Sequence, residues 1–358
     1  MKKTYKFIAV LLVFAMAAGI LVACNSTDDG KDNSTATAAP EGKSGLPVRA
    51  RDYIFTENLK MMLIVKSSGF VAFPLYVKAM EDQRLRYPNI TIDYKDSEFD
   101  VNRQITLIEE AVTQGYAAIF LEAMDPVALN NAVRAAEDAG VPVITCNGPE
   151  PTEPHTAHIS GADYSSGYTS GQMADEATRG MPNRTAIILD CPAAQKPGVR
   201  MGTGFEDYIK TTDIKLIEPP IGIENWSPEN AQISMRDMLT KYPNPGDITM
   251  VYTSSDDMAV GAMQAIDAAG RNEILIFSNI GYPQGLEGVR DGKMYSTMFS
   301  DTYVEFSLMF YAALHSISTG LTSVTGGFTE TPFLDMPLLP ATKDNVDDIM
   351  AVSRWYSK

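Results

Sequence analysis

Residues 101–121 read VNRQITLIEEAVTQGYAAIFL, a helical pattern that runs directly into a strand-like one. Val101, Ile105, Ile108 and Val112 step by four, three and four residues, the spacing of the apolar side of an amphipathic helix. The last five residues are an apolar run, the pattern of a strand buried on both faces. A helix followed by such a strand predicts part of a β-α-β unit with parallel strands.

The same alternation extends along the chain in both directions. It predicts a first set of strands at 61–65, 90–94, 117–121 and 142–146, with a second helix on Leu129, Val133 and Ala136 after the N-cap candidate Asp125-Pro126. A second set of strands is predicted at 185–189, 214–218, 248–252 and 274–277. Helices between them are predicted from the apolar positions Met235, Met238, Leu239 and Tyr242, and Met258, Ala262, Ala265, Ile266 and Ala269. The pattern predicts an α/β protein of two Rossmann-like lobes, each built on a parallel sheet.

Length and charge limit the possible functions. The chain has 358 residues, too many for one small domain, and 45% of them are apolar, enough for a packed core. Its net charge is −16, which repels a phosphate backbone. We therefore expect no nucleic-acid partner.

The N-terminus has the features of an export signal. Lys2, Lys3 and Lys6 precede an apolar stretch at 7–22, and the sequence Leu-Val-Ala before Cys24 resembles the lipobox of bacterial lipoproteins. This predicts a signal peptide at 1–23 and a lipid anchor to the cell membrane on Cys24. The alternative, a retained membrane span, is weakened because the stretch is shorter than the ~20 residues that a span needs. Residues 24–50 are small and polar and predict a flexible tether.

The other two cysteines, Cys146 and Cys191, lie in or next to apolar strand-like runs. Two buried thiols are therefore favoured over a disulfide between them. No cluster of cysteines for a metal ion can be drawn.

Ligands of open parallel sheets collect at the carboxyl ends of the strands, so the segments after each strand hold the candidate binding residues. Aromatic side chains there stack on sugar rings, and hydroxyl, amide and carboxylate groups bond to sugar hydroxyls. The predicted ligand-binding residues are Ser68, Phe70, Phe73, Glu122, Asn147, Arg200, Trp226, Ser255, Asp256, Asn279 and Asp301.

Several of these residues have a structural alternative. Phe70 and Phe73 have the alternative of packing under a helix, and Trp226 that of packing between helices of a lobe. Asp256 and Asp257 are also candidate N-caps of the helix that contains Met258.

Five motifs in collinear order resemble the type 1 periplasmic sugar-binding proteins, the ribose-binding group. They are Phe-Val-Ala-Phe-Pro at 70–74, Gly-Tyr-Ala-Ala-Ile at 115–119, Ala-Gly-Val-Pro-Val-Ile-Thr at 139–145, Ser-Asp-Asp-Met-Ala-Val-Gly-Ala at 255–262 and Asp-Gly-Lys-Met at 291–294. The resemblance implies two lobes joined by three crossover strands, which the chain passes near Gly161, Ser300 and Phe333. It places the N-terminal lobe at 51–161 plus 301–333 and the C-terminal lobe at 162–300 plus 334–358. It also implies that the lobes close on a monosaccharide or similar polyhydroxyl ligand and deliver it to an ABC permease.

The chain departs from the ribose group at several site positions. Asn147 and Gly148 stand where the group has an Asp-Arg pair, Ser255 replaces an Asn, and the second-lobe Arg position is Met201, one place after Arg200. Ile280, beside Asn279, replaces an Asp, whereas Trp226 matches the aromatic wall of the group. These departures predict a less ionic pocket and a ligand other than ribose.

Other functional classes are less well supported. None of the three histidines adjoins a Gly-x-Ser-x-Gly elbow, so no catalytic residue is predicted. His155 and His158 suggest a metal pair, but without a third ligand motif they favour a surface loop and no metal. Gly202-Thr-Gly204 lacks the third glycine of a dinucleotide site, so no cofactor is expected.

Two related binding functions stay open. One is a receptor that senses a ligand for a membrane histidine kinase or chemoreceptor without transport. The other is a binder of nucleosides or autoinducers. The lac-repressor family shares the lobes, but its members begin with a DNA-binding helix-turn-helix where this chain has an export signal.

Overall fold

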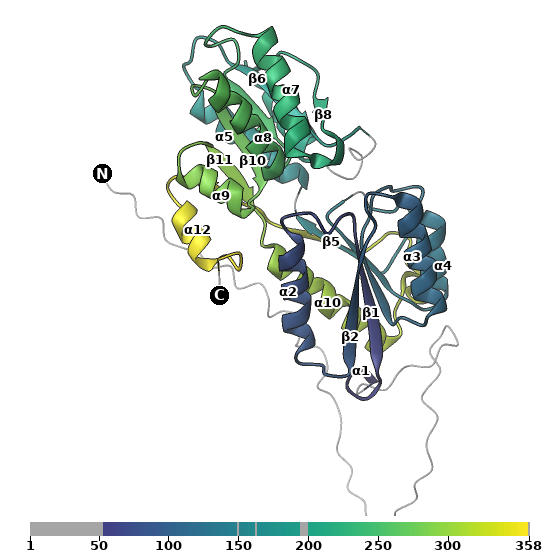
Figure 1. Cartoon of the computed structure of the whole chain (residues 1–358). Helices are drawn as coiled ribbons and strands as arrows, with labels where there is room; N and C mark the ends of the chain where they lie inside the picture. Colours follow the sequence, from purple (N-terminus) through teal and green to yellow (C-terminus); the bar gives the residue numbers. More distant parts are fainter. Residues whose placement is uncertain (1–52, 149, 162, 194–199, 357–358) are drawn as a thin grey trace, which may run out of the picture. The chain divides into compact units, whose positions relative to one another are not determined.

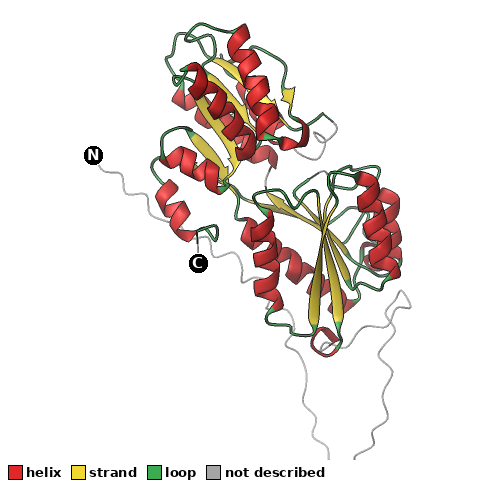
Figure 2. Ribbon diagram, in the orientation of Figure 1, coloured by secondary structure: helices red, strands yellow, loops and turns green. Residues whose placement is uncertain are grey.

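The computed structural model describes residues 53–148, 150–161, 163–193 and 200–356, which form two α/β lobes (Figure 1). The predicted signal peptide, Cys24 and the tether lie outside the described residues. Figure 2 shows a sheet with helices around it in each lobe. Among the described segments, no helix is both long enough and apolar enough to cross a membrane.

The first lobe contains a six-stranded sheet in the order β12-β5-β4-β3-β1-β2, and all its neighbouring strands are parallel. Its strands are β1 (Leu59–Val65), β2 (Ile90–Asp96), β3 (Ala118–Glu122), β4 (Val143–Cys146), β5 (Ala157–Gly161) and β12 (Phe333–Met336). Its helices are α1 (Tyr53–Thr56), α2 (Phe73–Arg84), α3 (Val101–Thr113), α4 (Asn130–Asp138), α10 (Thr302–Thr319) and α11 (Ser323–Gly326).

Strand β1 shows why a strand in the middle of this sheet is apolar over several successive residues, here 61–65. Met61 and Leu63 pack into a cluster with residues of α2 and α10, while Met62 and Ile64 pack into a second cluster with residues of α3 and α4. Because successive side chains of a strand point to opposite faces, helices on both faces require apolar residues at every position.

The second lobe contains a sheet in the order β13-β11-β10-β9-β6-β7, with β8 paired to β6. Its strands are β6 (Thr185–Asp190), β7 (Lys215–Leu216), β8 (Ile221–Gly222), β9 (Met250–Thr253), β10 (Leu275–Ile280), β11 (Ser296–Phe299) and β13 (Leu339–Thr342). Its helices are α5 (Asp163–Ala177), α6 (Met201–Ile209), the 3-10 turn η1 (Glu224–Trp226), α7 (Pro228–Lys241), α8 (Asp256–Ala269), α9 (Pro283–Arg290) and α12 (Val346–Val352). Among the described strands of this sheet, only β13 runs antiparallel to its neighbour, β11.

The chain passes between the two sheets three times. It leaves the first after β5, returns after β11 and crosses again between β12 and β13. Strand β12 pairs with β5 as far as Met336, so the third crossing follows Met336 and not Phe333. The boundary expected at 333 is therefore three residues too early.

All eight strands expected from the sequence form, although β7 has only two residues. Strands β5, β8, β11, β12 and β13 were not among those expected. Asp125 accepts hydrogen bonds from the backbone N–H groups of Val127 and Ala128, but α4 begins only at Asn130, so the predicted N-cap closes a separate turn. Cys146 and Cys191 are buried and form no disulfide with each other, as predicted.

Candidate functional site

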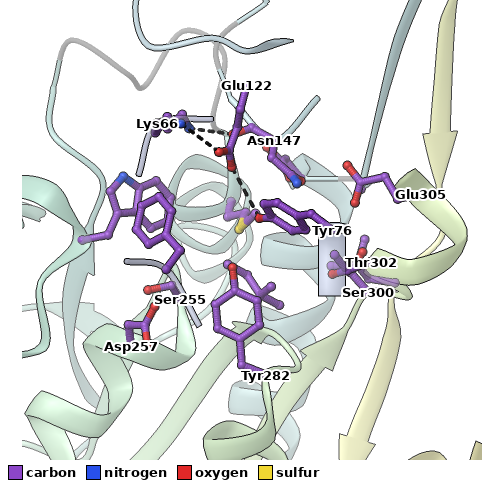
Figure 3. Close-up of a pocket in the computed structure, with 17 residues that line it drawn as sticks. Lys66, Tyr76, Glu122, Asn147, Ser255, Asp257, Tyr282, Ser300, Thr302 and Glu305 are labelled. Carbon is purple, nitrogen blue, oxygen red and sulfur yellow. Dashed lines mark hydrogen bonds between the residues drawn. The ribbon is translucent and has the colours of Figure 1, made fainter. Parts of the chain in front are cut away.

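Residues of both lobes line a pocket of about 750 Å³, a volume that includes its open mouth (Figure 3). Several lining residues come at or just after the carboxyl end of a strand, where ligands of parallel sheets bind. From the first lobe and the crossings, the lining residues are Lys66, Phe70, Tyr76, Glu122, Asn147, Gly161, Ser300, Thr302, Glu305 and Leu338. From the second lobe they are Asp163, Met201, Trp226, Ser255, Asp257, Ile280 and Tyr282.

A buried carboxylate, Glu122 at the end of β3, organises the first-lobe wall. It accepts a hydrogen bond from the backbone N–H of Lys66 (3.1 Å) and a longer one from the Tyr76 hydroxyl (3.4 Å). The Lys66 ammonium donates to the backbone carbonyl of Asn147 at 2.6 Å. Burial raises the pKa of Glu122, and the charge of Lys66 opposes this rise. These hydrogen bonds connect the ends of β1, β3 and β4 within the protein itself.

The turn after β4 depends on two residues with unusual backbone requirements. Asn147 has a φ of 45°, a left-handed conformation that asparagine tolerates better than most residues. A Cβ atom on Gly148 would lie 2.5 Å from the carbonyl oxygen of Ala123 and 2.9 Å from Nζ of Lys66. Glycine at 148 therefore lets the chain pass close to Lys66, in the position where the ribose group has an arginine.

Aromatic rings form the apolar part of the pocket. Tyr76 stacks on Phe306 with ring centroids 3.9 Å apart. Tyr282 from the other lobe contacts Trp355 edge to face at 5.8 Å. Phe70 packs edge to face on Phe99 at 5.4 Å. These contacts hold rigid apolar surfaces of the kind that pack on the C–H faces of a ring-shaped ligand.

Five of the eleven predicted binding residues line this pocket: Phe70, Glu122, Asn147, Trp226 and Ser255. Trp226 is half-buried and also packs against the hydrophobic cluster of the second lobe. Ser255 is the N-cap of α8 and accepts a hydrogen bond from the backbone N–H of Met258. The contact of these five residues with a ligand stays a prediction.

Three first-lobe or crossing candidates lie elsewhere. Ser68 is exposed and bonds through its backbone N–H to the Asp96 carboxylate (2.9 Å). Phe73 is the first residue of α2 and packs against Tyr94 and the core, so the alternative of packing under a helix applies to Phe73 and not to Phe70. Asp301 caps α10 by accepting a hydrogen bond from the backbone N–H of Val304.

Two second-lobe candidates each lie one residue away from a residue that does line the pocket. Arg200 is exposed, lies over the ring of Tyr164 and lines a different hollow, whereas Met201 lines the pocket. Asn279 is fully buried and donates to the Tyr252 hydroxyl, whereas Ile280 lines the pocket. Met201 and Ile280 are the positions that the comparison with the ribose group pointed to.

Asp256 is fully buried behind the pocket wall and is not among the residues that line it. Its carboxylate accepts hydrogen bonds from the backbone N–H of Tyr282 (2.6 Å) and the Thr297 hydroxyl (2.7 Å). Burial raises the pKa of Asp256 to about 7. The alternative of an N-cap is wrong, because Ser255 caps α8; the bonds of Asp256 instead fix Tyr282, which lines the pocket.

Asp256→Ala is expected to lower the free energy of unfolding by about 1–3 kcal/mol, because two buried donors lose their acceptor. Ligand affinity is expected to change by less than about threefold, since the carboxylate does not face the pocket. Urea unfolding and ligand titration of the variant measure the two effects. Asp257→Ala is the matched control, because Asp257 lines the pocket; it is expected to weaken binding more than it lowers stability. Weaker binding by Asp256→Ala with unchanged unfolding would contradict this role.

The pocket is more ionic than the sequence predicted. Besides Glu122, the carboxylates of Asp163, Asp257 and Glu305 line it, together with the Lys66 ammonium. Asp163 and Glu305 lie in the first turns of α5 and α10, directly after two of the crossings. Sequence reasoning missed Asp163 because it searched after strands expected from apolar runs, and β5 was not expected. After β11 it reached Asp301, the N-cap of α10, but not Glu305, which lies one helical turn further along. The crossings inferred at Gly161 and Ser300 were the signal that could have located them.

The prediction that His155 and His158 lie in a surface loop is wrong, since both are buried. The Thr145 hydroxyl lies 2.7 Å from Nε2 of His155 and 2.7 Å from Nδ1 of His158. Glu150 supplies a carboxylate beside the two rings. One carboxylate oxygen of Glu150 and one ring nitrogen of each histidine lie within 4.8 Å of one another. Burial lowers the pKa of His155 to about 4 and that of His158 to about 3. Both rings are therefore neutral at pH 7.

Comparison with known proteins agrees with this architecture. A model of the periplasmic binding protein domain matches residues 63–320. The xylitol-binding protein of Mycolicibacterium smegmatis is 27% identical over 261 residues, which cover 72% of this chain and 70% of that protein. The ribose import binding protein of Escherichia coli is 24% identical over 220 residues, which cover 61% of this chain and 70% of that protein.

Solved structures show the same fold at lower identity. An ABC transporter solute-binding protein from Mycobacterium smegmatis with bound glycerol has a TM-score of 0.72 at 21% identity, covering 84% of this chain and 99% of the other. One from Bacillus halodurans C-125 with bound myo-inositol has a TM-score of 0.71 at 18% identity, covering 83% and 98%.

Proposed function

Since the chain belongs to the periplasmic binding protein family, we propose that it is an extracytoplasmic receptor that binds a sugar or polyol and delivers it to an ABC permease. The observation that carries this proposal is the pocket between the strand ends of the two lobes, where aromatic faces adjoin hydrogen-bonding groups. Phe70 and Trp226 offer apolar surface, while Asn147, Ser300 and Thr302 offer amide and hydroxyl groups to a ligand's hydroxyls. The proposed role is binding and not catalysis.

The names of the relatives support this ligand class. One is a xylitol-binding protein and another is a ribose import binding protein, and both names describe small polyhydroxyl molecules. Two lobes that both contact one ligand also suit a closing motion, in which ligand contacts stabilise the closed form over an open one.

Screening sugars, polyols, nucleosides and amino acids by thermal shift tests the ligand class. A ligand that binds only the folded chain stabilises it by about 2.7 kcal/mol at a hundredfold excess over Kd. We expect sugars or polyols to raise the melting temperature in proportion to the logarithm of their concentration. If only amino acids or nucleosides do so, the carbohydrate assignment is lost.

The second part of the proposal is attachment to the membrane through a lipid on Cys24, which rests on the sequence Leu-Val-Ala-Cys at 21–24. Cells grown with an alkyne fatty acid are expected to label the wild-type protein and not Cys24→Ala. Equal labelling of the variant would contradict the anchor.

Trp226→Ala is expected to weaken ligand binding by about ten- to a hundredfold, because a stacking surface is lost from the pocket. The melting temperature of the ligand-free protein is expected to change little, since the side chain is only half-buried. Trp226→Phe is the matched control and is expected to retain most of the affinity, because it keeps an aromatic face. Calorimetric titration measures the affinities. A large loss of ligand-free stability with unchanged affinity would instead assign Trp226 to the core.

A further inference from the structure

The charged groups of the pocket are unbalanced. Among its described lining residues are four carboxylates, from Glu122, Asp163, Asp257 and Glu305, and one cationic side chain, that of Lys66. A neutral sugar needs hydrogen-bond acceptors, but it does not need an excess of negative charge. The excess of carboxylates therefore bears on the charge of the ligand.

Lys66 compensates for only part of this excess. Its ammonium donates to the carbonyl of Asn147, and its charge lowers the pKa values of Glu122 and Asp163 against the effect of burial. Asp257 also has a partner, since it accepts a hydrogen bond from the side-chain amide of Gln284 at 2.7 Å. Glu305 and Asp163 are left as the carboxylates to be explained, because burial outweighs the effect of Lys66 on Asp163, and the charges that act on Glu305 are those of other carboxylates.

Glu305 is 1% exposed, and its Oε1 atom has no hydrogen-bond partner in the described part of the chain. Figure 3 shows the carboxylate turned toward Asn147 and Tyr76. The Asp163 carboxylate, from the other lobe, is partly buried and lines the same pocket. A buried acceptor without a donor is costly, so a donor from outside the chain is expected at this place.

Charge strengthens this expectation. Burial raises the pKa of Glu305 well above its usual value, and the neighbouring charges of Asp163 and Glu122 raise it further. Burial also raises the pKa of Asp163 to about 7. Two carboxylates that disfavour each other's ionised form are stabilised by a cation between them more than by a neutral hydroxyl.

We propose that the ligand carries a protonated amine beside its hydroxyl groups, and that Glu305 and Asp163 bind this ammonium from opposite lobes. The aromatic rings of Tyr76 and Trp226 in the same pocket are compatible with a cation, because their faces carry negative charge density. The inference rests on the proposed function, since it specifies the kind of polyhydroxyl molecule that the pocket binds.

Matched ligands test this inference directly. The probes are D-glucosamine with D-glucose and N-acetyl-D-glucosamine, D-galactosamine with D-galactose, and N-methyl-D-glucamine with D-sorbitol, each measured by calorimetry and thermal shift. Within at least one set, the amine is expected to bind at least about tenfold more tightly than its neutral partner, the effect of a charge-assisted hydrogen bond.

Variants connect the preference to the two carboxylates. Glu305→Gln keeps the shape of the side chain and is expected to reduce the preference for the amine to less than about threefold. Asp163→Asn is the second variant, with the same expectation, in case Glu305→Gln folds poorly. Glu109→Gln, which removes a carboxylate from an exposed position on α3, is the control and is expected to keep the full preference.

The outcomes separate this inference from the proposed function. Neutral sugars that bind as tightly as their amine partners would overturn the ammonium site and leave the proposed function standing. An amine preference that survives in both Glu305→Gln and Asp163→Asn would also overturn it. If no probe of either kind binds, the polyhydroxyl assignment fails as well.

Discussion

Acidification from pH 7 to pH 4 is expected to destabilise the wild-type protein relative to a variant that lacks the two buried histidines, His155→Gln/His158→Gln. Their pKa values, about 4 and about 3 in the folded protein, lie below the ordinary value of 6.5. The unfolded chain therefore binds more protons than the folded one between about pH 6.5 and pH 3, so this contribution to stability falls as the pH falls. The difference amounts to about 3 kcal/mol for each histidine at pH 4.

The comparison with the variant is necessary because buried acids act in the opposite direction. Burial raises the pKa values of Asp163 and Asp256 to about 7, so the folded protein binds more protons than the unfolded chain as the pH falls from 7 to 4. Urea unfolding of wild type and double variant at several pH values isolates the histidine contribution. His315→Gln, at an exposed position, is the control and is expected to follow the wild type. A constant difference between wild type and double variant across this range would contradict the prediction.

Gly167→Ala is expected to lower the free energy of unfolding by about 3 kcal/mol or more, because α5 and α6 pack backbone to backbone at this point. A Cβ atom on Gly167 would lie 1.8 Å from the carbonyl oxygen of Met201, and one on Gly204 would lie 2.1 Å from that of Tyr164. Neither helix can keep its place if a methyl group is inserted. Since Met201 lines the pocket, the displacement is also expected to weaken ligand binding.

The expected change in stability has the opposite sign to that of an ordinary substitution of glycine by alanine in a helix. Replacing glycine by alanine inside a helix without such a contact stabilises it by about 1 kcal/mol. Gly222→Ala, in strand β8, is the control for a glycine without a close neighbour, because its Cβ would lie no closer than 3.5 Å to a neighbouring atom. Thermal and urea unfolding of both variants measure the difference. A Gly167→Ala protein as stable as Gly222→Ala would show that the two helices do not pack this closely.

Local pattern was enough to predict the architecture. The strand at 61–65 is apolar at every position because helices cover both faces of its sheet. The interior strands β5 and β11 lack such a run, since His158 and Ser160 lie in β5 and Ser296 and Thr297 in β11, and they were not expected. The order of strands and helices then left few arrangements other than two parallel α/β lobes. The edge strand β12 was missed because three of its four residues are exposed, so it lacks the apolar run that marks a central strand.

The sequence by itself determined which segments approach the pocket, and the tertiary structure decided which side chains enter it. Met201, Asp257 and Ile280 line the pocket, whereas Arg200, Asp256 and Asn279, each one residue earlier, do not. Adjacent residues at the end of a strand or the start of a helix point in different directions. A prediction that is wrong by one residue therefore selects a side chain in the core or on the surface and not one in the pocket. The acidic pair of Glu305 and Asp163 has the same origin. The two residues are 142 positions apart, and only the crossings of the chain between two sheets bring them to one pocket.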